Sequence, residues 1–172
     1  MFDSLNIFKK PENSQLSESL DQLSKDYLSS SANKKIREAI DFADKAHEGQ
    51  FRKSGEPFIT HPINVGLILV SLKMDVDTVI AGLLHDVVED CDIPLSDVKK
   101  KFGNNVSQLV DGVTKLLQLD EKMKDQSQAE HFQKMALATA EDVRVVIIKL
   151  ADRLHNLKTI EHLPRDKQVK KC

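Results

Sequence analysis

The strongest constraint on the fold is a helical repeat of apolar residues in the middle of the chain. These residues recur once per helical turn, the spacing of one buried helix face: Val76, Val79, Ile80, Leu83, Leu84, Val87 and Val88. At about 100° per residue, the opposite side carries His85 above Glu89 and Asp86 above Asp90. The repeat predicts one buried helix that runs to Asp90. A charged arc on a helix is more often a solvent-exposed surface. This stretch alone is therefore equally consistent with a functional site and with a solvent-exposed helix face.

Further helical segments predict an all-α fold. A run of β-branched residues from 143 to 150 would suit a strand. Helical periodicity nevertheless continues to Pro164, so we expect one long buried helix; the residues that carry it are Leu150, Leu154, Leu157 and Ile160. Start and stop residues bound three more helices, namely Asn33 to Gly49, Thr60 to Leu72, and Pro94 to Gly103.

The length and composition indicate one domain without a general affinity for polyanions. Of the 172 residues, we assign 1–15 to a flexible N-terminal tail and 16–172 to the domain. The net charge of −2 gives no overall attraction to nucleic acid, and no apolar run approaches a membrane span. We therefore expect neither nucleic acid nor a membrane as a partner. Cys91 and Cys172 lack metal-type spacing and no signal peptide is evident, which predicts reduced thiols in a cytoplasmic protein.

A basic loop precedes the first candidate ligand. Arg52, Lys53 and Ser54 stand at the start of a turn that Gly55 and Pro57 mark, followed by Thr60 and His61. If Thr60 caps the next helix, His61 lies in its first turn, where the helix dipole disfavours the imidazolium and leaves a lone pair for a metal. A basic pair on a turn is usually only surface. A histidine without function in a capping turn is about as probable as a ligand on this evidence.

The last long helix carries a polar stripe on an otherwise apolar element. Asp152, Asn156 and Thr159 recur at i, i+4 and i+7. A buried carboxylate needs a partner, because burying it unpaired is costly. Arg153 is adjacent in sequence and so points to another face, whereas a metal would satisfy Asp152. We interpret His155 and His162, which lie off the stripe, as ordinary packing or surface histidines.

Two imidazoles and two carboxylates from three predicted helices make one candidate ligand set. His61, His85, Asp86 and Asp152 offer mixed nitrogen and oxygen ligands, which suit Mn²⁺, Fe²⁺ or Zn²⁺. The order of these ligands resembles that of the HD superfamily of metal-dependent phosphohydrolases, an all-helical fold. Four motifs narrow the resemblance to the hydrolase domain of RelA/SpoT homologue proteins: residues 52–57 with His61-Pro62, 85–90, 110–116 and 149–157.

This resemblance implies an activity and a role for each candidate residue. The implied fold is a helical bundle with its metal site between three core helices. The implied reaction is Mn²⁺-dependent hydrolysis of the 3′-pyrophosphate of guanosine tetra- and pentaphosphate, the stringent-response alarmones. By similarity, Glu89 and Asp90 are the acidic pair associated with hydrolysis, and the metal ligands are His61, His85, Asp86 and Asp152. The positions matching nucleotide contacts are Arg52 against the guanine face, Lys53, Ser54, and Asn156 and Thr159 on the sugar side.

Three alternatives stay open at this point. Nothing in the chain resembles the synthetase domain that follows the hydrolase domain in long family members, so the chain is expected to be either a fragment or a short stand-alone hydrolase. The substrate could be another 2′- or 3′-phosphorylated nucleotide such as NADPH. The domain could also be a non-catalytic module that binds the alarmone and regulates a partner, although the intact Glu89-Asp90 pair argues against this.

Overall fold

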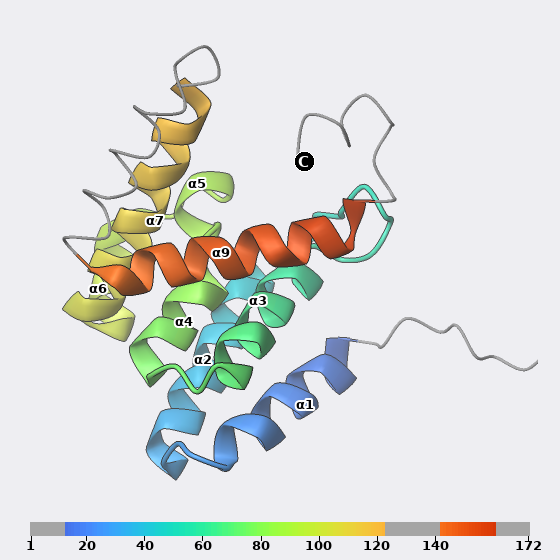
Figure 1. The fold of residues 1–172 in the computed structure, drawn as a ribbon, viewed down its shortest axis with the longest axis vertical. Helices are drawn as coiled ribbons and strands as arrows, with labels where there is room; N and C mark the ends of the chain where they lie inside the picture. The colour runs from blue at the N-terminus through green and yellow to red at the C-terminus, as the bar shows by residue number, and fades with distance from the viewer. Residues whose placement is uncertain (1–12, 123–141, 161–172) are drawn as a thin grey trace, which may run out of the picture.

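The computed structural model describes residues 13–122 and 142–160, which form α-helices joined by turns (Figure 1). Within these ranges, the single β-type pairing is an isolated bridge between Phe51 and Pro57. The all-α prediction is confirmed, and none of the described helices is long and apolar enough to span a bilayer. In chain order the helices are α1 (Asn13–Lys25), α2 (Ser30–Ala46), α3 (Thr60–Ser71), α4 (Val76–Leu84), α5 (Val87–Asp90), α6 (Leu95–Phe102), α7 (Asn104–Lys122) and α9 (Val143–Lys158).

Helices α3 and α4 form the centre of the bundle. Helix α3 packs against α1, α4 and α9, and α4 packs against α2, α7 and α9 (Figure 1). Gly82 permits close packing of the two central helices, because a Cβ atom at this position would collide with the Leu69 side chain of α3. The start of α3 thereby reaches the end of α4, where the ring centroids of His61 and His85 lie 5.2 Å apart.

The β-branched run after residue 142 is helical, as predicted. It forms α9, which begins behind the N-cap Asp142, whose carboxylate accepts a hydrogen bond from the Arg144 backbone N–H at 2.9 Å. Figure 1 shows α9 lying across the central helices, and residues Val145, Ile148 and Ala151 are buried there. Tertiary packing of this face outweighs the strand preference of its β-branched side chains. The helix ends at Lys158, before the predicted Pro164, which lies outside the described residues.

The predicted central helix is broken at the residues that carry its chemistry. Helix α4 ends at Leu84 and α5 begins at Val87, so the prediction of one helix to Asp90 was wrong. The His85 side chain explains the break, because its Nδ1–H donates to the Gly82 carbonyl at 2.7 Å and so competes for an acceptor of the helix ladder. After this break the Asp86 carboxylate lies beside the His85 ring, with Oδ1 3.1 Å from Nε2.

Three helix starts differ from the sequence predictions. Ser29, rather than Asn33, caps α2 by accepting a hydrogen bond from Ala32 N at 3.2 Å. Asn33 is buried inside α2 and donates to the Leu28 carbonyl. Thr60 is the first residue of α3, not its cap, and its hydroxyl donates to the Pro57 carbonyl at 2.8 Å. Helix α1 begins at Asn13, so residues 13–15 are helical and do not belong to the expected tail, whose other residues lie outside the described ranges.

Asp75 caps α4 and should contribute measurably to stability. Its carboxylate accepts hydrogen bonds from Asp77 N, Thr78 N and the Thr78 hydroxyl. Burial raises its pKa, but these hydrogen bonds and the Arg144 charge outweigh burial and hold the pKa below 3.8. We expect Asp75→Ala to lower the free energy of unfolding at pH 7 by about 1 kcal/mol, measured by urea denaturation.

The control for this prediction is Asp41→Ala, which removes an exposed carboxylate from the interior of α2. Because the folded-state pKa of Asp75 is lowered, its contribution is present above pH 3.8 and is lost as the pH falls through the folded-state value. A stability difference that is unchanged at pH 2 would contradict the capping role.

Candidate active site

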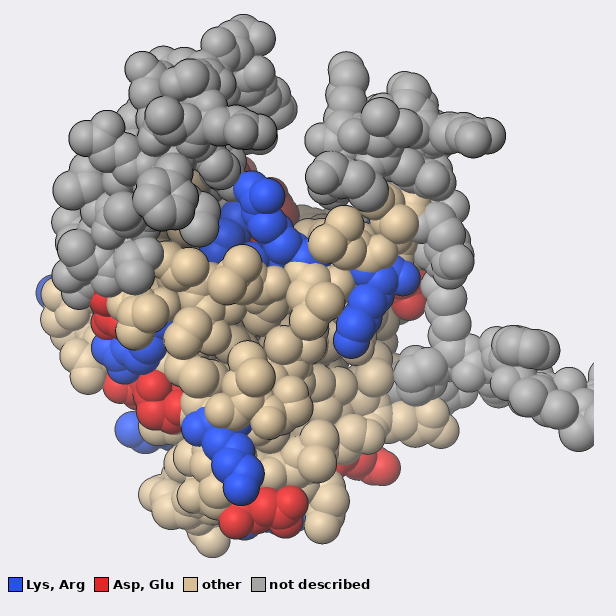
Figure 2. Space-filling model, in the orientation of Figure 1, with Lys and Arg blue, Asp and Glu red and all other residues tan. Residues whose placement is uncertain are grey.

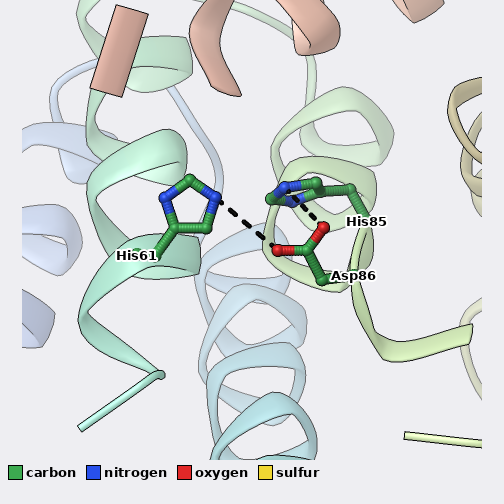
Figure 3. Close-up of side chains that lie close together, drawn as sticks. All are labelled: His61, His85 and Asp86. Carbon is green, nitrogen blue, oxygen red and sulfur yellow. Dashed lines mark ion pairs between the residues drawn. The ribbon is translucent and has the colours of Figure 1, made fainter. Parts of the chain in front are cut away.

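The predicted metal ligands come together from three parts of the bundle. His61 lies in the first turn of α3, His85 and Asp86 form the turn between α4 and α5, and Asp152 lies on α9. One potential ligand atom each from His61, His85 and Asp86 lies within 4.8 Å of the others (Figure 3). Asp152 Oδ1 lies 3.2 Å from His61 Nε2 and 3.8 Å from His85 Nε2. Asp152 thus lies next to both histidines of this three-residue group.

The environment of His85 fits a cation. Since His85 Nδ1–H donates to a backbone carbonyl, Nε2 of the neutral ring carries a lone pair. This Nε2 lies 3.1 Å from Asp86 Oδ1, yet within the described residues it is buried without a hydrogen-bond partner. A lone pair and a carboxylate oxygen facing each other leave two acceptors without a donor, which is unfavourable in a buried place. A divalent cation between them satisfies both groups.

Burial and neighbouring charges set the ionisation of the two flanking groups, His61 and Asp86. Burial lowers the pKa of His61 to about 3, despite the raising effect of Asp152. His61 is therefore neutral at pH 7, and its Nε2 faces Asp152 Oδ1 and, at 3.6 Å, Asp86 Oδ2. Burial raises the pKa of Asp86, and the carboxylates of Asp152 and Asp90 raise it further. Two like charges in a dry site repel each other, and a bound cation would relieve that repulsion.

Asp152 is held in place by its neighbours on α9. Its Oδ2 accepts a hydrogen bond from Lys149 Nζ at 3.0 Å, and its Oδ1 accepts one from Asn156 Nδ2 at 2.6 Å. Burial alone would raise the pKa of Asp152, but the interactions with His61, His85 and Lys149 outweigh it and hold the pKa well below 3.8. Asp152 is therefore a fixed carboxylate at neutral pH.

The basic loop brings Arg52 against α9. Its guanidinium donates from Nη2 to Asn156 Oδ1 at 3.1 Å and to Thr159 Oγ1 at 3.2 Å. The loop closes on itself, because Gly55 N donates to the Arg52 carbonyl and Arg52 N to the Glu56 carbonyl. Gly55 has φ +84, a conformation that glycine adopts without strain. Arg52, Asn156 and Thr159, three predicted nucleotide contacts, thus form one hydrogen-bonded group.

The remaining predicted residues lie on the rim of this region. Lys53 is exposed in the loop, and the Ser54 hydroxyl donates to Glu56 Oε1 at 2.8 Å. Glu89 and Asp90 are exposed on α5, shortly after the candidate ligand Asp86. The backbone N–H of Asp90 donates to the Asp86 carbonyl at 2.8 Å, which couples the acidic pair to the ligand turn.

Sequence reasoning missed two residues at this site. Lys149 is buried and forms an ion pair with Asp152. Its position one helical turn before Asp152 is the sequence feature that indicates this pairing, although Arg153 is the only side-chain partner weighed above. The interpretation of His155 as an ordinary packing or surface histidine overlooked a contact, because its Nδ1 lies 2.7 Å from Nδ1 of the candidate ligand His61. No spacing rule revealed this second contact, since the two histidines are far apart in sequence. His162 lies outside the described residues.

Comparison with known proteins agrees with this geometry. The profile of a family described as HD domain matches residues 39–171. The chain belongs to the HD-domain family. Within it, this HD domain is related to the RelA/SpoT homologues: it is 48% identical over 153 residues to the bifunctional (p)ppGpp synthase/hydrolase SpoT of Escherichia coli K12, a match that covers 89% of this chain.

Other relatives support the same assignment. The HD domain is 50% identical over 145 residues to a GTP pyrophosphokinase of Streptomyces coelicolor, covering 84% of this chain and 17% of that protein. A solved structure of a metazoan SpoT orthologue that hydrolyses ppGpp aligns with a TM-score of 0.64 at 32% identity, over 84% of this chain and 80% of that one. The chain spans about a fifth of the Escherichia coli relative, since the match covers 22% of its length.

Proposed function

We propose that this HD domain hydrolyses the 3′-pyrophosphate of guanosine tetra- and pentaphosphate, yielding GDP or GTP and pyrophosphate, with Mn²⁺ as cofactor. The observation that carries the proposal is the link between two groups of side chains. Asn156 donates to Asp152 in the ligand cluster and accepts from Arg52 of the loop. A nucleotide held by the loop would therefore place its phosphates beside the cluster. Relatives named guanosine-3′,5′-bis(diphosphate) 3′-pyrophosphohydrolase, such as that of Vibrio cholerae, support the choice of substrate.

The metal would be held by His61, His85, Asp86 and Asp152. When bound, a divalent cation lowers the pKa of a coordinated water from 15.7 toward about 7 and neutralises charge on the phosphoryl group. Nitrogen and carboxylate ligands together suit Mn²⁺, whose neighbours in the first transition row are the competing ions. We propose one Mn²⁺ per site.

The remaining residues would bind the nucleotide and move protons. The planar Arg52 guanidinium suits stacking on guanine, and Lys53 supplies a compact cation for phosphate charge. Ser54 belongs to the same loop, while Asn156 and Thr159 are placed to contact the sugar. Of the acidic pair Glu89 and Asp90, one carboxylate would take the proton of the attacking water and the other would protonate the leaving 3′-oxygen.

Two further parts of the proposal concern the protein as a whole. Because the relatives are several times longer, we propose that this domain works with a C-terminal synthetase or regulatory region. A cytoplasmic location stays a prediction from the cysteine content of the sequence.

The deciding experiment is an assay of pyrophosphate release from guanosine tetraphosphate. Purified protein with Mn²⁺ should form GDP and pyrophosphate, and EDTA or Asp86→Ala should abolish the reaction. NADPH is assayed in parallel for release of phosphate. Turnover of NADPH alone would replace the proposed substrate, and tight binding of guanosine tetraphosphate without turnover would indicate a regulatory module.

Arg52 should determine affinity for the nucleotide. Arg52→Lys keeps the charge but removes the planar fork that reaches Asn156 and Thr159. Loss of the planar group proposed to stack on guanine should weaken nucleotide binding by about 1.4 kcal/mol or more, so we expect KM for guanosine tetraphosphate to rise about tenfold or more. Arg37→Lys is the matched control, because Arg37 pairs with Asp21 on α1. Steady-state kinetics that show equal KM values for the two variants would exclude this role.

A further inference from the structure

A second histidine lies directly behind the ligand His61. The two Nδ1 atoms of His61 and His155 are 2.7 Å apart, and their ring planes are tilted by 34° at a centroid distance of 4.9 Å. Both side chains are buried, with 3% and 7% of their surface exposed. At this distance the two nitrogens share one proton, because two N–H groups pointed at each other would repel. One ring is therefore the donor and the other the acceptor.

The direction of this hydrogen bond decides what His61 offers to the cluster. If His155 donates, the single proton of neutral His61 sits on Nε2, which faces Asp152 Oδ1 at 3.2 Å and is then closed to a metal. If His155 accepts, His61 carries its proton on Nδ1 and turns the Nε2 lone pair toward the carboxylates. Only the second arrangement makes His61 a ligand.

We propose that His155 is a positioning residue that accepts the Nδ1 proton of His61 and thereby fixes the metal-binding tautomer. Metal-binding histidines usually donate their second ring N–H to an acceptor such as a carboxylate, a backbone carbonyl or a water, which orients the ring and raises its basicity. His85 already follows this rule through the Gly82 carbonyl. The inference rests on the metal site of the proposed function and does not depend on the substrate.

The location of His155 on α9 adds to its effect. His155 lies one helical turn after Asp152, so the same helix supplies one ligand directly and orients another through a hydrogen bond. Helix α9 packs on α3, which carries His61. A correctly docked α9 therefore aligns half of the ligand set.

The test compares His155→Asn with His155→Leu in the full chain. The amide oxygen of Asn occupies nearly the place of histidine Nδ1 and accepts a hydrogen bond, whereas Leu has a similar size and accepts none. The readout is Mn²⁺ affinity without nucleotide, measured by the electron paramagnetic resonance signal of free Mn²⁺. We expect His155→Leu to bind Mn²⁺ about 10–100-fold more weakly and His155→Asn to bind it nearly as tightly as wild type.

A third variant and a stability control keep the result interpretable. His155→Gln sets its amide oxygen beyond the Nδ1 position and should weaken Mn²⁺ binding as Leu does, which covers the case in which His155→Leu fails to fold. Thermal unfolding in EDTA reports on folding of each variant. Equal Mn²⁺ affinity of the Leu variant and wild type, or equal loss in the Asn and Leu variants, would overturn the role of His155 alone. Wild-type protein that binds no Mn²⁺ would overturn the metal site as well.

Discussion

Asp152→Asn should abolish metal-dependent hydrolysis and also destabilise the metal-free protein by about 3 kcal/mol. Asp152 is a proposed ligand and at the same time the partner of Lys149, and the side chains of both are only 8% exposed. The amide of Asn still accepts a hydrogen bond from Lys149 but carries no charge. A buried ammonium would then lack an ionised partner, which is the most damaging way to break a buried ion pair.

Asp86→Asn is the matched comparison, because it should lose the same activity without the loss of stability. Burial and neighbouring carboxylates raise the pKa of Asp86, so its ionised form opposes folding in the absence of metal. By linkage, Asp86→Asn should gain stability at pH 7, and the gain should vanish below the unfolded-state pKa of about 3.9. The contribution of Asp152 has the opposite sign, since its lowered pKa stabilises the fold above pH 3.8 and this stabilisation is lost as the pH falls through the folded-state value.

Urea denaturation in EDTA at pH 7 separates the two variants. We expect the unfolding midpoint of Asp152→Asn to fall and that of Asp86→Asn to stay equal or rise. Similar losses in both variants would contradict the electrostatic difference between the two carboxylates. Pyrophosphate release in Mn²⁺ should be absent from both, which ties the stability comparison to the site.

The double variant Glu89→Gln/Asp90→Asn should lower kcat by at least 10²-fold and leave Mn²⁺ affinity close to that of wild type. General acid–base catalysis by one positioned side chain contributes about 10²–10⁴-fold. Both carboxylates are exposed on α5, next to the ligand turn but outside the buried cluster. Their removal therefore affects proton transfer much more than metal binding.

The pH dependence of the single variants assigns the two roles. Removing the general base should abolish the acidic limb of the kcat/KM profile, and removing the general acid should abolish the alkaline limb. Asp92→Asn is the control, because Asp92 is exposed two residues after Asp90, and at its φ of +53 Asn is well tolerated. Full activity of the double variant would exclude proton transfer by this pair.

Much of the fold could be predicted from periodicity, because long apolar stripes specify helices strongly. The β-branched run of α9 was assigned correctly, since its periodicity extended well beyond the run itself. The start of α2 was misplaced because Ser29 and Asn33 are both good capping residues, and sequence alone does not say which backbone N–H groups are left unpaired. The break after Leu84 was missed because a side chain, His85, takes a backbone acceptor, and apolar periodicity does not register such competition.

The candidate site could be predicted where its residues are close in sequence or share a helix face. Contacts between residues far apart in sequence could not be predicted. His85 and Asp86 are adjacent in sequence, and Asp152, Asn156 and Thr159 share one helix face. Arg52 donates a hydrogen bond to Asn156 across 104 residues of sequence. The family resemblance implied that both residues contact the nucleotide, but neither it nor the spacing predicted this contact. Neither the spacing nor the family resemblance indicated the role of His155, because its partner His61 is 94 residues away in sequence.

The span of the site has a consequence for the newly made protein. Residues from Arg52 to Thr159 form the contacts that join loop and cluster, so nearly the whole domain must be synthesised before they exist. A nascent chain that has exposed only α1 to α7 holds His61, His85 and Asp86 but lacks the side chains that α9 contributes to the site. Docking of α9 thus adds Asp152 and Asn156 to the candidate ligands that α3 and α4 already hold together. We therefore expect metal binding and hydrolysis to appear only after α9 has docked.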